Sequence, residues 1–235
     1  MEIFKKKDMS EFTKEYEKNK RLLMSTVDKG IMKYFQKRGE EIQRLMSYYR
    51  CAMMEIETKF RVLNEEYSLQ HDRNPINSIK TRIKQLPSIA EKLERKGLEL
   101  SLEAIEENLN DVAGIRVICA FQDDVYTLAN ALLAQDDVTL IERKDYIANP
   151  KPNGYRSLHL IVSVPIFLEK EKRSMKVEIQ LRTIAMDCWA SLEHQLRYKK
   201  DYEFTDAMQQ ELYECAALSK DLDNRMDKLR SSMDI

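Results

Sequence analysis

The sequence contains few of the residues that break helices or cross-link a chain. Only five glycines and five prolines occur among 235 residues, while 34% of the side chains are charged. This composition favours long helices around a modest sheet and argues against a repeat or low-complexity protein. The four cysteines stand singly, without a CxxC pair, which argues against a disulfide framework and against a structural zinc site.

Long apolar runs, a secretory leader and a net charge of one sign are also lacking. The longest apolar run, around 158–168, contains His159 and Pro165 and suits a strand better than a membrane span of about 20 residues. Without a leader at the start of the chain, we expect a cytoplasmic protein with reduced thiols. Lys and Arg total 39 against 40 Asp and Glu, so any anion site has to come from local clustering.

Apolar residues recur at alternating spacings of three and four near both ends of the chain. The N-terminal stripe consists of Ile42, Met46, Tyr49, Met53, Ile56, Phe60, Leu63 and Tyr67. The C-terminal stripe consists of Met208, Leu212, Cys215, Ser219, Leu222, Met226 and Leu229. We therefore expect a helical extension at 1–70 and a C-terminal helix at 201–235. Both stripes could pack on the central domain, or they could pair helices between subunits.

The central part of the chain, 71–200, alternates between strand and helix patterns. β-branched segments of period two predict strands at 111–121, 137–146, 155–167 and 175–183. Periodicity near 3.6 predicts helices at 101–109, 121–134 and 184–199, the first with Ser101 as a candidate N-cap. The resulting fold class is α/β (α+β), with a mixed sheet flanked by helices.

Two carboxylates form the first candidate site. In a strand at 175–183, Glu178 and Gln180 share one face with Arg182, at steps of about 7 Å. Asp111 lies at the mouth of an apolar strand, where a buried carboxylate needs a partner. Asp111 and Glu178 could therefore be oxygen ligands of Mg²⁺. The alternative is an ordinary solvated face of an antiparallel sheet.

The most basic stretch, 78–96, forms the second candidate site. As a strand, it would place Lys80, Arg82 and Lys84 on one face. The Pro-Ser pair at 87–88 would then begin a helix, and the backbone N–H groups at its N-terminus could bind a polyphosphate. A solvated basic face beside an acidic helix is the alternative.

The third candidate is the loop "NPKPNGYRSLHLIV" at 149–162. Its prolines and glycine bend the backbone, Lys151 and Arg156 offer phosphate contacts, and the Tyr155 ring offers a surface on which a base can stack. His159 is either part of the same pocket or a buried histidine with satisfied hydrogen bonds. These groups are typical of a nucleotide-binding loop.

Five motifs occur in the order and approximate spacing of one known family. From about Tyr67 to Lys199 the sequence resembles the synthetase domain of the RelA/SpoT homologues, most closely the single-domain small alarmone synthetases of the RelP type. The motifs are "TRIK" (81–84), Ser88 to Gly97, "DVAGIRVIC" (111–119), "RKDYI" with "PKPNGYRSLHLIV" (143–162), and "VEIQLRTIAMDCWASLEHQLRYK" (177–199).

The resemblance implies a GTP pyrophosphokinase, which moves the β,γ-diphosphate of ATP to the 3′-hydroxyl of GDP or GTP. The products would be AMP and the alarmones ppGpp or pppGpp of the stringent response. Asp111 and Glu178 would bind Mg²⁺, with Glu178 as the candidate base. The implied ATP-binding residues are Arg82, Lys84, Ser88, Lys92, Arg95 and Arg116, with the two arginines 82 and 116 on either side of adenine. The implied acceptor-binding residues are Lys144, Lys151, Asn153, Tyr155, His159, Gln180 and Asp187, with the tyrosine stacked on guanine.

The resemblance also suggests partners and limits. Small members of the family are homotetramers built from their terminal helices, so we expect a homotetramer without a membrane or an obligatory nucleic-acid partner. The three histidines do not complete the metal site of the hydrolase domain in longer relatives, so we expect synthesis without hydrolysis. We expect no regulatory domain after Ile235, and therefore control by expression, assembly or a metabolite.

Two other functions stay open at this point. One is a protein that binds guanine nucleotides or single-stranded RNA without catalysis. The other is a different nucleotidyltransferase, which would release pyrophosphate instead of AMP. Position 187 is Asp where some relatives have Asn, which leaves the preferred acceptor open.

Overall fold

A mixed sheet forms the centre of the protein. The computed structural model describes residues 38–71, 73–197 and 205–233. Its five strands are β1 (Ile76–Ile83), β2 (Ala113–Cys119), β3 (Thr139–Asp145), β4 (Leu158–Phe167) and β5 (Lys172–Thr183). They lie in the order β1-β2-β5-β4-β3. β2 and β5 run parallel and the other neighbours antiparallel, so the predicted mixed sheet is confirmed.

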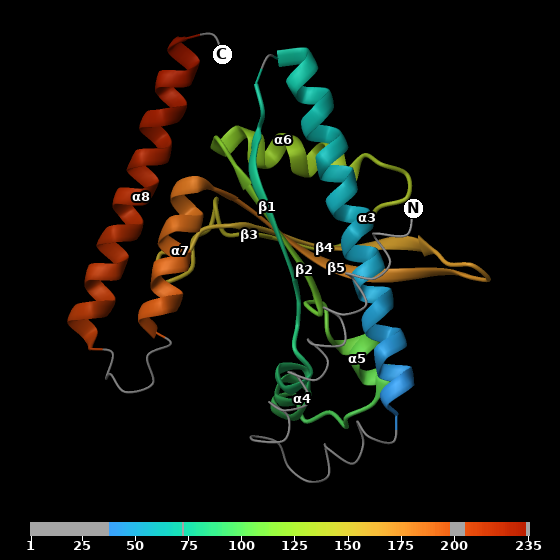
Figure 1. Cartoon of the computed structure of the whole chain (residues 1–235). Helices are drawn as coiled ribbons and strands as arrows, with labels where there is room; N and C mark the ends of the chain where they lie inside the picture. Colours follow the sequence, from blue (N-terminus) through green and yellow to red (C-terminus); the bar gives the residue numbers. More distant parts are fainter. Residues whose placement is uncertain (1–37, 72, 198–204, 234–235) are drawn as a thin grey trace, which may run out of the picture.

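Helices surround the sheet (Figure 1). They are α3 (Gly39–His71), α4 (Leu86–Arg95), α5 (Leu102–Asn108), α6 (Gln122–Leu133), α7 (Ile184–Arg197) and α8 (Asp206–Ser232). The hydroxyl of Ser101 accepts a hydrogen bond from the Ala104 N–H at 2.9 Å, which confirms the predicted N-cap of α5. Among the described helices, none has the length and apolar character that crossing a membrane requires.

The N-terminal apolar stripe packs on the sheet of its own chain. Ile42, Tyr49, Ile56 and Phe60 of α3 are buried in the same core cluster as Val177 and the other inward residues of the strands. α3 contacts β1, β2, β4 and β5, and also α6, so it crosses one face of the sheet (Figure 1). The packing explanation therefore holds for this stripe, while the part of the predicted extension at 1–37 lies outside the described residues.

The C-terminal stripe behaves differently. α8 stands beside α7, on the side of the molecule away from α3 (Figure 1). The side chains that α8 buries are Ala216 and Asp223, whereas Leu222, Met226 and Leu229 of the stripe are about half exposed. Packing on the central domain therefore does not account for this stripe within one chain.

The alternation of β5 divides the sheet into an apolar and a polar face. Val177, Ile179 and Leu181 are completely buried in the core, as the sequence predicted. Glu178 and Gln180, which alternate with them, are only partly buried and project from the other face. The polar face is therefore the one available to ligands.

We expect α3 to be part of the folding unit and not a loosely attached extension. Phe60→Ala should lower the free energy of unfolding by about 3–5 kcal/mol, because it leaves a cavity in the core. The control is Met54→Ala on the same helix, where the side chain is 62% exposed and the expected change is below about 0.5 kcal/mol. Urea unfolding of both variants measures the difference, and equal small losses would contradict this packing.

Candidate active site

A row of polar side chains crosses all five strands on the polar face. In the strand register, Lys80 pairs with Arg116, Arg116 with Gln180, Gln180 with His159, and His159 with Lys144. Directly paired residues on neighbouring strands project from the same face of a sheet. The register therefore brings four of the predicted site residues onto one line with Lys80.

A second row lies one strand step away. Arg82 pairs with Gly114, Gly114 with Glu178, and Glu178 with Ile161. Because Gly114 has no side chain, nothing stands on the sheet between the arginine and the carboxylate. This gap is the natural place for a substrate group between the basic strand β1 and Glu178.

Asp111 lies just before β2 and is held by two lysines. The Nζ atoms of Lys84 and Lys92 both lie 2.7 Å from its Oδ2. Its other oxygen, Oδ1, is buried and has no hydrogen-bond partner among the described residues. Burial acts to raise the pKa of Asp111, but the two ammonium groups outweigh it and hold the pKa below its ordinary value. Asp111 is therefore ionised, with one oxygen left for a further positive group.

The short helix α4 presents a polar stripe and an open N-terminus. Ser88, Lys92 and Arg95 are spaced by four and three residues, so they share one face, while Ile89 and Leu93 are buried. Gln85 at the N-cap makes no side-chain capping bond. The predicted helix start at the Pro-Ser pair is thus confirmed, and its backbone N–H groups are available to an anion.

A cavity of about 230 Å³ lies on the other side of Glu178. It is lined by Glu142, Lys144, Tyr146, Lys151, His159, Ile161 and Glu178. The Nζ of Lys151 lies 4.7 Å from the ring centroid of Tyr146 and 4.8 Å from that of Tyr155. A cation between two aromatic rings, beside a further base, can attract a negatively charged ligand with a flat ring.

Two hydrogen bonds connect Arg182, Tyr155 and His159, and the histidine lies beside Glu178. Arg182 Nη2 donates to the Tyr155 hydroxyl at 2.6 Å, and that hydroxyl lies 2.8 Å from His159 Nε2. With its oxygen accepting from the arginine, the hydroxyl can donate its proton to Nε2, which assigns the remaining imidazole proton to Nδ1. Nδ1 lies 3.8 Å from Glu178 Oε1. The network fixes the tyrosine and the histidine relative to the carboxylate.

Burial and nearby charges keep the histidine neutral and make the carboxylate a stronger base. Burial, together with the positive charges of Arg182 and Lys151, lowers the pKa of His159 to about 3. Burial and the negative charge of Asp111 raise the pKa of Glu178 above its ordinary value, despite a 3.2 Å hydrogen bond from Gln180 Nε2. A buried carboxylate with a raised pKa is a suitable acceptor for a proton near neutral pH.

Asp187, predicted for the acceptor pocket, is buried among cations. Its carboxylate lies 2.9 Å from Lys80 Nζ, 3.2 Å from Arg116 Nη1 and 3.3 Å from Arg182 Nη1. Burial acts to raise its pKa, but Lys80 and Arg116 outweigh that effect and lower it. In this arrangement Asp187 fixes the positions of Arg116 and Arg182. Its contact with the acceptor stays a prediction.

Asn153 shapes the loop from within. Its Oδ1 accepts a hydrogen bond from the Tyr155 N–H at 3.2 Å, and its Nδ2 donates to Glu193 of α7 at 3.4 Å. The loop glycine, Gly154, has a φ of +87°, a value that other residues rarely adopt. These contacts define the backbone of the loop next to Tyr155, and the acceptor contact predicted for Asn153 itself stays a prediction.

The sequence analysis was wrong about one residue of this site and missed the part that two others play in it. Arg156 does not offer a phosphate contact, because it is 5% exposed and pairs with Asp223 of α8 at 2.5 Å. Tyr146 was missed, although alternation from Lys144 would have placed it on the same face. Arg182 was placed on the polar face without a role, because a sequence does not reveal which hydroxyl or carboxylate a buried guanidinium meets.

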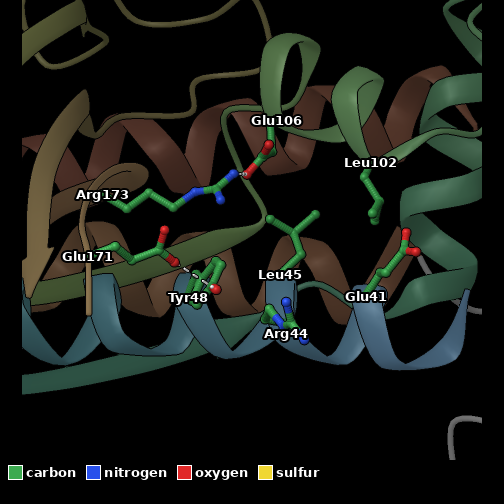
Figure 2. Close-up of a pocket in the computed structure, with 8 residues that line it drawn as sticks. All are labelled: Glu41, Arg44, Leu45, Tyr48, Leu102, Glu106, Glu171 and Arg173. Carbon is green, nitrogen blue, oxygen red and sulfur yellow. Dashed lines mark hydrogen bonds and ion pairs between the residues drawn. The ribbon is translucent and has the colours of Figure 1, made fainter. Parts of the chain in front are cut away.

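A separate cavity of about 280 Å³ lies between α3, α5 and the start of β5 (Figure 2). Its charged side chains mostly bind one another, since Arg173 pairs with Glu106 and the Tyr48 hydroxyl donates to Glu171 at 3.0 Å. These contacts join the β4–β5 hairpin to α5 and to α3. None of the predicted site residues lines this cavity.

The imidazole of His159 should remain neutral across the physiological range. Because its folded pKa lies below the unfolded value of about 6.5, its contribution to stability is complete above that pH and is lost as the pH falls toward 3. NMR titration of the ligand-free protein should show no protonation of His159 between pH 8 and pH 5. The urea-unfolded chain, as the control, should titrate near the ordinary value, and a folded-state midpoint near 6 to 7 would contradict the buried network.

Comparison with known proteins agrees with this geometry. Residues 81–203 match the family described as a region found in RelA / SpoT proteins. The chain is 42% identical over 195 residues to the GTP pyrophosphokinase YwaC of Bacillus subtilis (strain 168), covering 83% of this chain and 93% of that protein.

Solved structures give the same result. The small alarmone synthetase 1 from Bacillus subtilis bound to its product pppGpp superposes with a TM-score of 0.74 and 34% identity, covering 82% of this chain and 98% of that one. The same enzyme bound to AMPCPP gives 0.69 and 32% identity, covering 83% and 98%. With residues 81–203, more than half of the chain, matched by the family and 42% identity to a relative that is covered almost entirely, the chain belongs to the RelA/SpoT family.

Proposed function

We propose that this protein is a GTP pyrophosphokinase that transfers the β,γ-diphosphate of ATP to the 3′-hydroxyl of GDP or GTP. The observation that carries the proposal is the position of Glu178, between a basic surface on β1 and α4 and a ring-lined cavity on the β3 and β4 side. A transferase for two nucleotides needs a binding site on each side of the reacting groups. Membership of the RelA/SpoT family and the resemblance to YwaC support the same activity.

The donor nucleotide belongs on the basic surface. Lys84 and Lys92 converge on Asp111, and Ser88 and Arg95 continue the polar stripe of α4 toward solvent. These groups, with the open N-terminus of the helix, suit a triphosphate. Arg82 and Arg116 project from the same face, one on each of the paired strands β1 and β2, and can bracket adenine.

The acceptor nucleotide belongs in the cavity with the rings. Tyr155 offers the stacking surface for guanine, and its hydroxyl is fixed by Arg182 and His159. Lys144 and Lys151 line the same cavity and can bind the 5′-phosphates of the acceptor. Gln180 lies between Arg116 and His159 in the polar row, next to the place where the two nucleotides meet.

The chemistry then follows from placement. The 3′-oxygen of the acceptor attacks the β-phosphorus of ATP, the bond from that phosphorus to the oxygen bridging to the α-phosphate breaks, and AMP leaves. Glu178 accepts the proton of the 3′-hydroxyl, for which its raised pKa is suited. Lys84 and Lys92 stabilise the negative charge that develops on the departing AMP oxygen and the transferred phosphates.

The carboxylates also suit a magnesium ion. Mg²⁺ prefers oxygen ligands and commonly binds through one or two carboxylates together with substrate phosphates. Asp111 Oδ1 is buried without a partner in the described part of the chain, as expected of an atom that binds a further group. We therefore propose Asp111 and Glu178 as its protein ligands. When bound, Mg²⁺ would neutralise part of the charge on the ATP phosphates.

Removing either carboxyl charge should abolish transfer without unfolding the protein. We expect Asp111→Asn and Glu178→Gln to reduce the rate of AMP formation at least about 100-fold, since each change removes a charged group from the reacting centre. The control is Glu169→Gln, an exposed residue between β4 and β5, which should keep full activity. Purified variants are mixed with ATP, Mg²⁺ and GDP or GTP, and the products are identified by mass spectrometry.

The products of the unmodified protein decide between the activities considered above. AMP with a 3′-diphosphorylated guanine nucleotide supports the proposal, whereas release of pyrophosphate would indicate a different nucleotidyltransferase. Binding of GDP without any product would indicate a protein that only binds nucleotides. Full activity in either carboxylate variant would contradict the roles given to Asp111 and Glu178.

We further propose a cytoplasmic homotetramer. The four cysteines are free thiols, as expected in a reducing compartment. Leu222, Met226 and Leu229 leave an apolar stripe exposed along α8, with Leu218 69% exposed beside it. Burying such side chains between subunits would contribute about 1.5–3 kcal/mol each.

Charging this stripe should disrupt the assembly. Leu222→Glu with Leu229→Glu is expected to convert the tetramer into smaller species, because the interface would then bury unpaired carboxylates. Lys220→Gln, an exposed polar position on the same helix, is the matched control. Native mass spectrometry reads the subunit number, and an unchanged tetramer in the double variant would contradict the role of this surface.

A further inference from the structure

The loop that carries Tyr155 is attached to α8 by a buried ion pair. Arg156 Nη2 lies 2.5 Å from Asp223 Oδ2, and these residues are only 5% and 7% exposed. They are 67 positions apart in the sequence, so the contact fixes the loop to an element that contributes nothing else to the cavity. Asp223 and Ala216 are the side chains that α8 buries.

The backbone of the loop also lies directly against α8. A Cβ atom at position 154 would collide with the Cβ of Ala216, so only a glycine allows this approach. The indole Nε1 of Trp189 on α7 donates to the Leu212 carbonyl of α8 at 2.9 Å. α8 is thus held at the right distance from α7 and meets the loop on both sides of Tyr155, at positions 154 and 156.

We propose that Asp223 is a positioning residue for acceptor binding, which acts through Arg156 to hold the Tyr155 loop in the arrangement that receives the guanine nucleotide. This inference rests on the proposed function for the identity of the ligand. It assigns α8 a second task besides offering its exposed apolar stripe. The pair itself touches neither nucleotide.

The buried charge of Arg156 makes the contact with Asp223 specific. A buried guanidinium is costly unless its charge is balanced, and Asp223 is the carboxylate that balances it. Within the described residues, this guanidinium makes one further hydrogen bond, a long one from Nη2 to Gln122 Oε1 at 3.4 Å. Its Nε and Nη1 have no hydrogen-bond partner in the described part of the chain. The charge of Arg156 is therefore balanced by one carboxylate, which lies on α8.

Away from α8, the loop is held by the bond from Asn153 to Glu193 of α7 and by the bonds of the Tyr155 hydroxyl to Arg182 and His159. Its internal hydrogen bonds run from the Lys151 N–H to the Tyr155 carbonyl at 3.1 Å and from the Gly154 N–H to the Lys151 carbonyl at 2.8 Å. They close a small turn but do not orient that turn relative to the sheet. Loss of the ion pair should leave the turn intact but remove its charged anchor on α8, so that the Tyr155 ring is positioned less firmly.

The test compares two aspartates on the same helix. Asp223→Asn removes the charge that Arg156 faces, whereas Asp221→Asn removes an exposed charge that pairs only with Arg225 one turn away. A third variant, Arg156→Met with Asp223→Leu, replaces the pair by apolar groups of similar size, a change that often preserves stability. It keeps the test valid should the single variant fail to fold.

The inference predicts a selective effect on the acceptor. In Asp223→Asn and in the double variant the KM for GDP should rise about tenfold, as expected when the competent loop arrangement falls to about a tenth of the population. The KM for ATP should stay within about twofold, and Asp221→Asn should match the unmodified protein in both. An unchanged GDP KM in a folded variant, or an equal rise for both substrates, would overturn the proposal.

A second measurement needs no substrate and separates this inference from the proposed function. In the ligand-free protein, the backbone amides of 149–157 should exchange about tenfold faster in Asp223→Asn and in the double variant than in the unmodified protein. Exchange in β5 should be unchanged. Faster exchange there without any nucleotide-dependent product would mean that the positioning contact exists but the proposed activity does not. Unchanged exchange together with normal transferase activity would reject the positioning role while leaving the activity intact.

Discussion

The parallel pairing of β2 with β5 is the constraint on which the site depends. The register sets Gly114 beside Glu178 and Arg116 beside Gln180, and so joins two segments that are more than 60 positions apart in the chain. Asp111, just before β2, thereby comes to the same end of the sheet as Glu178. Together with burial, its negative charge raises the pKa of Glu178. A shift of one residue would turn every polar side chain of β5 into the core beneath α3. The apolar residues under that helix therefore hold the catalytic register in place.

Nearby charges set the protonation states of the groups on each side of the site. On one side, two lysines keep Asp111 ionised, while one of its oxygens is left without a protein partner. On the other side, burial and the surrounding cations lower the pKa of His159 and keep its imidazole neutral, so that it can accept a hydrogen bond from Tyr155 without adding charge beside Glu178. These two arrangements explain how the two carboxylates differ: Asp111 is held as an anion, whereas the pKa of Glu178 is raised, which is what the base proposed above requires.

Periodicity in the sequence predicted much of this architecture, and its limits are physical. The alternation in β5 identified the face of Glu178 and Gln180, and the proline and serine before Ile89 marked the start of α4. Strand order and register come from long-range pairing, so no local pattern could reveal that Lys80, Gln180 and Lys144 share a line. Arg156 was misjudged for the same reason, because an arginine in a basic loop looks available for phosphate until its distant carboxylate is known. The apolar stripes on α3 and α8 look alike in sequence, yet one is buried in its own chain and the other is exposed.

The central claim is that Asp111 and Glu178 bind one divalent ion between the two nucleotides. Its most direct test is a crystal structure of the protein with AMPCPP and Mn²⁺ in place of Mg²⁺, with data collected at the manganese absorption edge. The account predicts an anomalous peak at about 2.0–2.3 Å from a carboxylate oxygen of both residues, in the range of a divalent ion with oxygen ligands. A peak coordinated by phosphates alone, or carboxylates too far apart to share the ion, would contradict it.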